Sequence, residues 1–100
     1  MTSKGSNAAK RVLRVWQALK GQSATGLSNS DICKMLGESA PNVTRALITL
    51  MEEGLVEKNQ NGRFSHSVKT LQIATAHQEH IARLRQRIDQ LEANIRAGSL

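Results

Sequence analysis

Apolar residues near the start of the chain recur at spacings of three and four, which predicts an amphipathic helix over residues 6–21. Ser6 or Asn7 can cap this helix, and Gly21 can end it in a left-handed conformation. The face expected to be buried carries Ala8, Val12, Val15, Trp16 and Leu19. The remaining positions carry Lys10, Arg11, Arg14 and Gln17, so the outer side is basic.

A second, shorter helix is predicted after the Gly/Ser/Thr-rich connection over residues 21–28. Ser28 can cap it while Asp31 reaches back from the third helical position, and Gly37 can close it. The apolar residues expected to face the core are Ile32, Met35 and Leu36.

A third helix follows after a turn at residues 37–39, with Ser39 as its expected cap and Pro41 tolerated in its first turn. Gly54 can end it. One face carries Val43, Ala46, Leu47 and Leu50 and should lie on the core, which leaves the other face polar. Two helices joined by so short a turn, the second with a polar outer face, predict a helix-turn-helix.

Two short alternating runs, residues 55–58 and 63–66, predict a β-hairpin directly after the third helix. Asn61-Gly62 between them matches a two-residue hairpin turn. A hairpin in this place is the wing of a winged helix-turn-helix.

A long helix is predicted from about Val68 to Gly98. Its apolar positions follow a heptad seam, with isoleucine at a and leucine at d: Ile81, Leu84, Ile88, Leu91 and Ile95. This choice of residues favours a parallel two-stranded coiled coil, in which Arg87 at g faces Glu92 at e of the partner. The alternative is a helix that packs on its own domain. Burial of the apolar residues of barely three heptads stabilises a dimer by little more than the free energy that association costs. We therefore expect helix 6–21 or the start of the long helix to contribute to the dimer as well.

Together these elements predict a mostly α-helical fold with a small β-hairpin. We expect a winged helix-turn-helix domain over residues 1–70 and a C-terminal helix, a dimerising coiled coil, over residues 71–97.

Charge adds a preference for a polyanionic partner. The formal net charge is +6, and residues 1–26 hold five basic side chains and no acid. Only two aromatic residues, Trp16 and Phe64, are present, which argues against modules that stack single-stranded bases on aromatic platforms.

Several classes of function are disfavoured. No apolar run is long enough for a membrane span, and the N-terminus lacks the pattern of a secretory signal. The single cysteine, Cys33, is interpreted as a small packing residue, in keeping with a reducing cytoplasm. No catalytic set or cofactor motif stands out, so we expect neither an enzyme nor a cofactor. His77 and His80 have a spacing that could bind a metal, but His77 is interpreted as a polar layer of the coil, so no metal site is predicted.

The stretch from Arg11 to Ala74 resembles the DNA-binding domain of the IclR family of transcriptional regulators. The resemblance rests on residues 11–19, on Gly26–Ile32, on Val43-Thr44-Arg45 with Leu47 and residues 49–50, on Glu53–Glu57 and on residues 61–64. It implies a winged helix that binds duplex DNA. Three residues depart from the family pattern: Glu38, where an apolar residue is usual, Pro41, and His66, which replaces an aliphatic residue.

Family members typically continue into a large effector-binding domain, whereas this sequence ends after the coil. We therefore expect no small-molecule effector. A regulator of this size resembles those of phages and other mobile elements, by analogy alone.

The third helix is expected to enter the major groove. The residues predicted to contact DNA lie on this helix, at the two helix caps and on the wing: Ser28, Ser39, Asn42, Thr44, Arg45, Thr49, Lys58, Asn61 and Arg63. Asn42 can pair with adenine and Arg45 with guanine, but Asn42 can equally support the helix start, and Arg45 can clamp a phosphate or join an intramolecular ion pair.

The predicted function is sequence-specific binding of double-stranded DNA by a homodimeric transcriptional regulator, with repression favoured over activation. Such a dimer would recognise an inverted repeat. One alternative is a winged-helix module that binds other proteins, which the acidic Glu52, Glu53 and Glu57 would suit. Another is a DNA-binding accessory factor for replication or transposition of a phage or mobile element.

Overall fold

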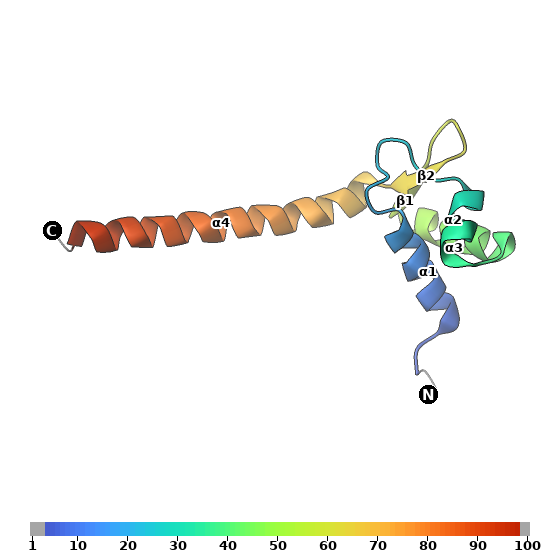
Figure 1. The fold of residues 1–100 in the computed structure, drawn as a ribbon, viewed down its shortest axis with the longest axis horizontal. Helices are drawn as coiled ribbons and strands as arrows, with labels where there is room; N and C mark the ends of the chain where they lie inside the picture. The colour runs from blue at the N-terminus through green and yellow to red at the C-terminus, as the bar shows by residue number, and fades with distance from the viewer. Residues whose placement is uncertain (1–3, 99–100) are drawn as a thin grey trace. The chain divides into compact units, whose positions relative to one another are not determined.

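The computed structural model describes residues 4–98, and the chain divides after Thr70 into two compact units (Figure 1). The first unit holds three helices, a β-hairpin and the first turn of a fourth helix. The second unit is the rest of that fourth helix. Residues 1–3, which the predicted DNA-binding domain includes, lie outside the described residues.

A serine caps each of the three helices of the first unit. These helices are α1 (Asn7–Ala18), α2 (Asn29–Leu36) and α3 (Ala40–Glu52). The hydroxyls of Ser6, Ser28 and Ser39 each accept a hydrogen bond from the backbone N–H three residues later. Ser28 and Asp31 form the reciprocal capping box, as predicted. Each cap satisfies a backbone donor that has no partner within its helix, which fixes where each helix begins.

The core lies where the three helices and the hairpin meet. Its buried apolar residues are Val15, Leu19, Ile32, Val43, Ala46, Leu47, Leu50, Val56 and Phe64. All four residues predicted for the inner face of α3 are among them. Two other expectations are wrong. Ala8 is exposed because α1 packs through its C-terminal half, and Met35 is 57% exposed because Ile32 and Leu36 already occupy the inner side of the short α2.

The wing is an antiparallel pair of short strands, β1 (Val56–Lys58) and β2 (Phe64–His66), in which Lys58 pairs with Phe64. The prediction of a two-residue Asn61-Gly62 turn is wrong. Asn59 N–H bonds to the carbonyl of Arg63, which leaves a three-residue loop over residues 60–62. A two-residue type I′ turn needs positive φ at both central residues, whereas only Gly62 has it here, at +75°.

A backbone bridge before α2, which the sequence did not indicate, extends the wing. Leu27 N–H donates to the carbonyl of Phe64 at 2.9 Å, and Phe64 N–H donates to the carbonyl of Leu27 at 2.8 Å. Gly26 makes this approach possible, since it has φ +76° and a Cβ there would lie 2.8 Å from the carbonyl oxygen of Phe64. The start of α2 is thereby fastened to the wing.

The fourth helix, α4 (Val68–Gly98), begins at the predicted residue. Its first turn is held by the first unit: Ser67 donates to the carbonyl of Gly54, and Thr70 donates to the carbonyl of Leu55 at 2.7 Å. Ser67 and Thr70 are both buried and lie two heptads before Ile81 and Leu84. The first turn of α4 therefore packs on the first unit, as the alternative hypothesis proposed for the whole helix.

The predicted seam lies beyond that turn and has no buried residue within the chain. Ile81 and Leu84 are half-buried, and Ile88, Leu91 and Ile95 are 55%, 59% and 62% exposed. Leucine and isoleucine side chains left in water forgo the apolar burial that stabilises a fold. The seam is an apolar stripe without a partner in the described chain.

Candidate nucleic-acid interface

The outer face of α3 gathers four of the predicted DNA-contact residues. Thr44, Arg45 and Thr49 are exposed, and Asn42 is half-buried. The opposite face of the same helix is locked into the core by four buried residues, which fixes the direction in which the polar face points. This face is a polar helix surface of the kind that can lie in the major groove.

A chain of polar contacts runs from α1 to the outer face of α3. Arg11 Nε lies 3.3 Å from Glu38 Oε1, although its N–H is not aligned for a hydrogen bond. Asn42 Nδ2 donates to Glu38 Oε2 at 3.1 Å, and Arg45 Nη2 donates to Asn42 Oδ1. The hydrogen bond from Asn42 and the interaction with Arg11 hold the pKa of Glu38 below its ordinary value. Glu38 is thus connected to Arg45 through one intervening side chain.

A second polar chain ends at Thr44. Asn29 Nδ2 donates to Thr44 Oγ1 at 2.9 Å, and Cys33 Sγ donates to Asn29 Oδ1 at 3.2 Å. Because the Thr44 hydroxyl accepts from Asn29, its own proton is directed elsewhere, and its methyl group can face outward. Cys33 also packs against the core, as predicted, and additionally orients Asn29.

A groove of about 240 Å³ separates α1 from the outer face of α3. Its lining combines apolar and polar side chains: Ala8, Arg11, Val12, Asn42, Arg45, Ala46 and Thr49. Thr49 is partly committed within its own helix, since its hydroxyl donates to the carbonyl of Arg45 at 3.1 Å. Ala8, Arg11 and Val12 of α1 therefore border the polar face of α3.

The two predicted phosphate-contact serines serve first as helix caps. Each accepts a backbone hydrogen bond and keeps its own hydroxyl proton for another acceptor. A phosphate oxygen is one such acceptor, and a helix N-terminus favours an anion.

On the wing, Lys58 and Asn61 are exposed near the tip. Lys58 Nζ lies 5.6 Å from the centre of the Phe64 ring, within cation–π range. Asn59 stabilises the loop, because its Oδ1 accepts from the backbone N–H groups of Asn61 and Arg63.

Arg63 directly follows the loop of the wing, but its side chain contacts the start of α2. Its Nε donates to the carbonyl of Gly26 at 3.2 Å, and its Nη2 lies 3.3 Å from Asp31 Oδ2. The hydrogen bonds from Ser28, and to a smaller extent the charge of Arg63, hold the pKa of Asp31 below its ordinary value. The structure therefore does not bring Arg63 together with Lys58 and Asn61, and instead ties the wing to the start of α2.

His66 belongs to a separate cluster that sequence reasoning noted only as a departure. Its Nε2 lies 2.7 Å from the carbonyl oxygen of Trp16, so this nitrogen carries the proton. The two rings lie 5.6 Å apart between centroids, and Trp16 Nε1 donates to Thr70 Oγ1 at 3.2 Å. This cluster connects α1, the wing and the first turn of α4.

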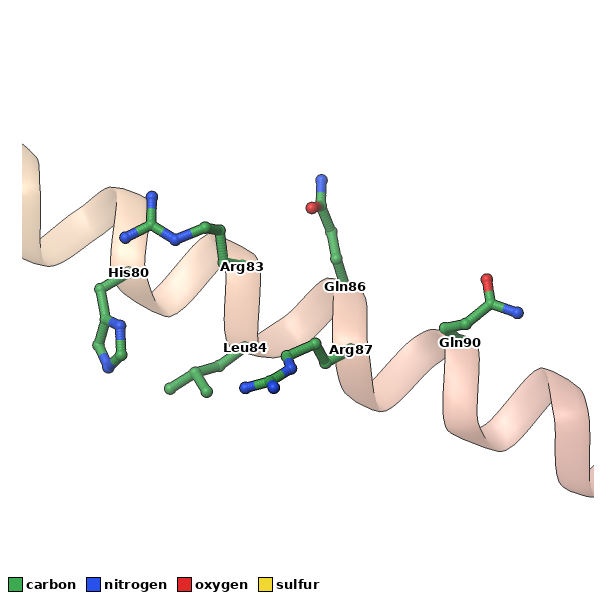
Figure 2. A pocket seen from close by; sticks show the side chains of 6 residues that line it. All are labelled: His80, Arg83, Leu84, Gln86, Arg87 and Gln90. Atoms are coloured by element: carbon green, nitrogen blue, oxygen red, sulfur yellow. The ribbon is translucent and has the colours of Figure 1, made fainter.

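The second unit presents a different surface. Figure 2 shows a shallow depression lined by one helix alone, with His80, Leu84 and Arg87 projecting to the same side of α4. Arg83, Gln86 and Gln90 complete its lining. In this depression the seam residue Leu84 lies beside basic and amide side chains of the same helix.

Residues 4–98 contain neither a metal-binding group nor a membrane-spanning helix. No group of three or more His, Cys, Asp or Glu side chains there could hold a metal ion. No helix in that part of the chain is long and apolar enough to cross a membrane.

Comparison with known proteins adds a family match. The family described as the IclR helix-turn-helix domain matches residues 8–60, which include all of α1 but its first residue and the whole of α2, α3 and β1. No curated protein sequence matches the chain.

Solved structures show the same fold. A crystal structure of an IclR family transcriptional regulator from Brucella abortus is similar, with a TM-score of 0.63 and 23% identity, and covers 73% of this chain and 28% of that one. The Agobacterium tumefaciens repressor BlcR matches with a TM-score of 0.54 and 19% identity, over 69% of this chain and 27% of that one. MepR, a transcription regulator of the Staphylococcus aureus multidrug efflux pump MepA, matches with a TM-score of 0.54 and 18% identity, over 86% of this chain and 72% of that one. The chain thus spans little more than a quarter of the first two proteins.

Proposed function

The chain belongs to the IclR helix-turn-helix family, a family of DNA-binding regulators rather than enzymes, and we propose that it binds double-stranded DNA sequence-specifically as a homodimeric transcriptional regulator. In this proposal α3 enters the major groove. The face that carries Asn42, Thr44, Arg45 and Thr49 is turned toward the bases, and Ser28, Ser39, Lys58 and Asn61 contact the sugar–phosphate backbone.

The observation that carries the proposal is the outer face of α3. Thr44, Arg45 and Thr49 are exposed there, and partners on α2 and on the α2–α3 turn already orient Thr44 and the half-buried Asn42. Ordering side chains before binding lowers the entropy cost of recognition. Arg11 of α1 borders the same face, and the net positive charge of the chain favours approach of a polyanion.

Dimerisation through α4 is the second part of the proposal. The seam of Ile81, Leu84, Ile88, Leu91 and Ile95 is uncovered, and a second copy of the chain supplies the matching stripe. Isoleucine at the a positions and leucine at the d positions favour a coiled coil of two parallel helices. A two-fold dimer recognises an inverted repeat whose half-sites lie one or more helical turns apart.

Repression is the proposed outcome of binding, because a protein bound at a promoter excludes other proteins from the same duplex. The similar Agobacterium tumefaciens protein is itself a repressor.

Arg45→Ala provides the experimental test. The variant should bind its duplex at least about tenfold more weakly, because a bidentate arginine–guanine contact contributes about 1–3 kcal/mol. Fluorescence anisotropy measures the affinity, and analytical ultracentrifugation should show an unchanged dimer. Arg83→Ala, which removes the same charge from α4, is the matched control and should bind like the wild type.

Salt dependence is the second readout. Wild-type affinity should fall steeply between about 50 and 200 mM salt, since neutralised phosphates release counterions. A wild-type affinity that does not change with salt concentration, or an Arg45→Ala variant that binds like the wild type, would contradict the proposal.

A further inference from the structure

The contacts around Asn42 decide which of two neighbouring residues can recognise a base. Its Nδ2 donates to Glu38 Oε2 at 3.1 Å, and its Oδ1 accepts from Arg45 Nη2. A carboxylate can only accept and a guanidinium can only donate, so these two partners leave one orientation for the amide group. Asn42 is therefore held between an acceptor on one side and a donor on the other.

Bidentate recognition of adenine uses both ends of an asparagine amide, the oxygen towards N6 and the nitrogen towards N7. Each end of the Asn42 amide already has one partner within the chain, which leaves one N–H and one oxygen lone pair and fixes the direction in which both point. Arg45 is in the opposite position: one of its five N–H donors bonds to Asn42, and the side chain is exposed. Its remaining donors are available for the O6 and N7 acceptors of guanine.

We propose that Arg45 reads a guanine in each half-site, and that Asn42 and Glu38 are positioning residues that hold Arg45 for this contact. The inference rests on the proposed DNA binding and assigns the base class that α3 recognises. Asn42 acts as a spacer between Glu38 and Arg45, and it does not read a base of its own.

The charge at Glu38 fits a positioning role. A carboxylate beside a DNA-binding face repels phosphate, so its presence there needs a compensating interaction. Arg11 supplies a nearby positive charge, with Nε 3.3 Å from Glu38 Oε1. The carboxylate is thereby kept ionised and able to accept from Asn42. An arginine restrained before binding loses less side-chain entropy when it meets the base.

The test compares base preferences rather than affinities alone. The full-length wild type, Arg45→Ala, Asn42→Ala, Glu38→Ala and Glu38→Gln are each measured against duplexes in which every base pair of the selected half-site is replaced in turn. Glu52→Ala is the matched control for Glu38→Ala, because it removes an exposed carboxylate from the other end of α3. Thermal melting of each variant establishes that it is folded.

The expected pattern is a loss of preference at one position only. Arg45→Ala should abolish the preference for guanine there, a change of about tenfold or more. Asn42→Ala and Glu38→Ala should weaken the preference at that same base pair by about threefold to tenfold, since they act through Arg45. Glu38→Gln, which keeps an acceptor for Asn42, should retain most of it. Asn42→Ala combined with Arg45→Ala should lose no more preference than Arg45→Ala alone.

Two results would overturn the inference while leaving DNA binding intact. One is an Asn42→Ala variant that loses preference at a different base pair, particularly an A·T pair. The other is a Glu38→Ala variant with the same base preferences as Glu52→Ala. A wild type that binds all duplexes alike would instead overturn the proposed function and this inference together.

Discussion

The two units of this chain treat their apolar residues in opposite ways. In the first unit, Val43, Leu47 and Leu50 of α3 are almost fully buried, with Leu47 only 1% exposed. Along α4, Leu91 is 59% exposed and Ile95 is 62% exposed. The first unit therefore completes its own core, whereas the second unit carries an apolar stripe that is satisfied only by another helix. Fold and assembly are separated along the sequence, with the boundary after Thr70.

The same substitution in each unit gives the largest expected contrast. Leu47→Ala should destabilise the first unit by about 2–5 kcal/mol, because it removes buried methyl groups and leaves a cavity. Leu91→Ala should leave the unfolding of that unit unchanged and weaken self-association instead. Urea unfolding followed by Trp16 fluorescence reports on the first unit, and sedimentation equilibrium reports on the dimer. A Leu91→Ala variant with the destabilisation of Leu47→Ala would show that the two units form one cooperative structure.

Removal of most of α4 should separate assembly from folding. A chain ending at Thr75 keeps the first turn of α4, including the buried Thr70 and its hydrogen bond to Leu55. It should fold as a monomer and bind a single half-site weakly, because the seam is gone. Multi-angle light scattering measures its mass. A truncated chain that stays fully dimeric would show that the coil is not the main contact, and that other apolar residues such as Leu13 join the copies.

Acidic pH should weaken the first unit, with a smaller effect. The pKa values of Asp31 and Glu38 lie below their ordinary values of 3.8 and 4.5 in the folded chain. Lowered folded pKa values add stability that is fully present above the unfolded values and is lost as pH falls through the folded ones. The midpoint temperature of thermal unfolding should therefore decrease as the pH is lowered below about 4.5. The Asp31→Asn, Glu38→Gln double variant should show a shallower decline, and an identical decline would mean that these two carboxylates do not contribute.

Local features were predictable from the sequence because they depend on residues a few positions apart. The serine caps, the capping box of Ser28 and Asp31, and the start of α4 all follow from short-range spacing. The inner face of α3 follows from periodicity. The family resemblance, confirmed by the match over residues 8–60, extended these local signals to a whole fold.

Long-range contacts were not predictable in the same way. Arg63 pairs with Asp31, which lies 32 positions earlier, and no pattern around either residue indicates the pair. The bridge between Leu27 and Phe64 depends on Gly26, whose role becomes visible only when the wing is placed beside it. The prediction of a two-residue turn in the wing was wrong because Asn61 does not adopt a positive φ, although asparagine tolerates one more readily than most residues. The link from Glu38 to Arg45 likewise needs the turn geometry between α2 and α3.

Selection of binding sites from a pool of random duplexes tests the central claim most directly, because it examines the DNA-reading face of α3 and the pairing of α4 at once. Incubation of the full-length protein with the pool, followed by sequencing of the bound fraction, should return an inverted repeat. Its half-sites should lie about 10 base pairs apart, or a multiple of this spacing, and should share a guanine. A pool without enrichment would contradict DNA recognition by α3. An enriched site without two-fold symmetry would contradict the dimer formed through α4.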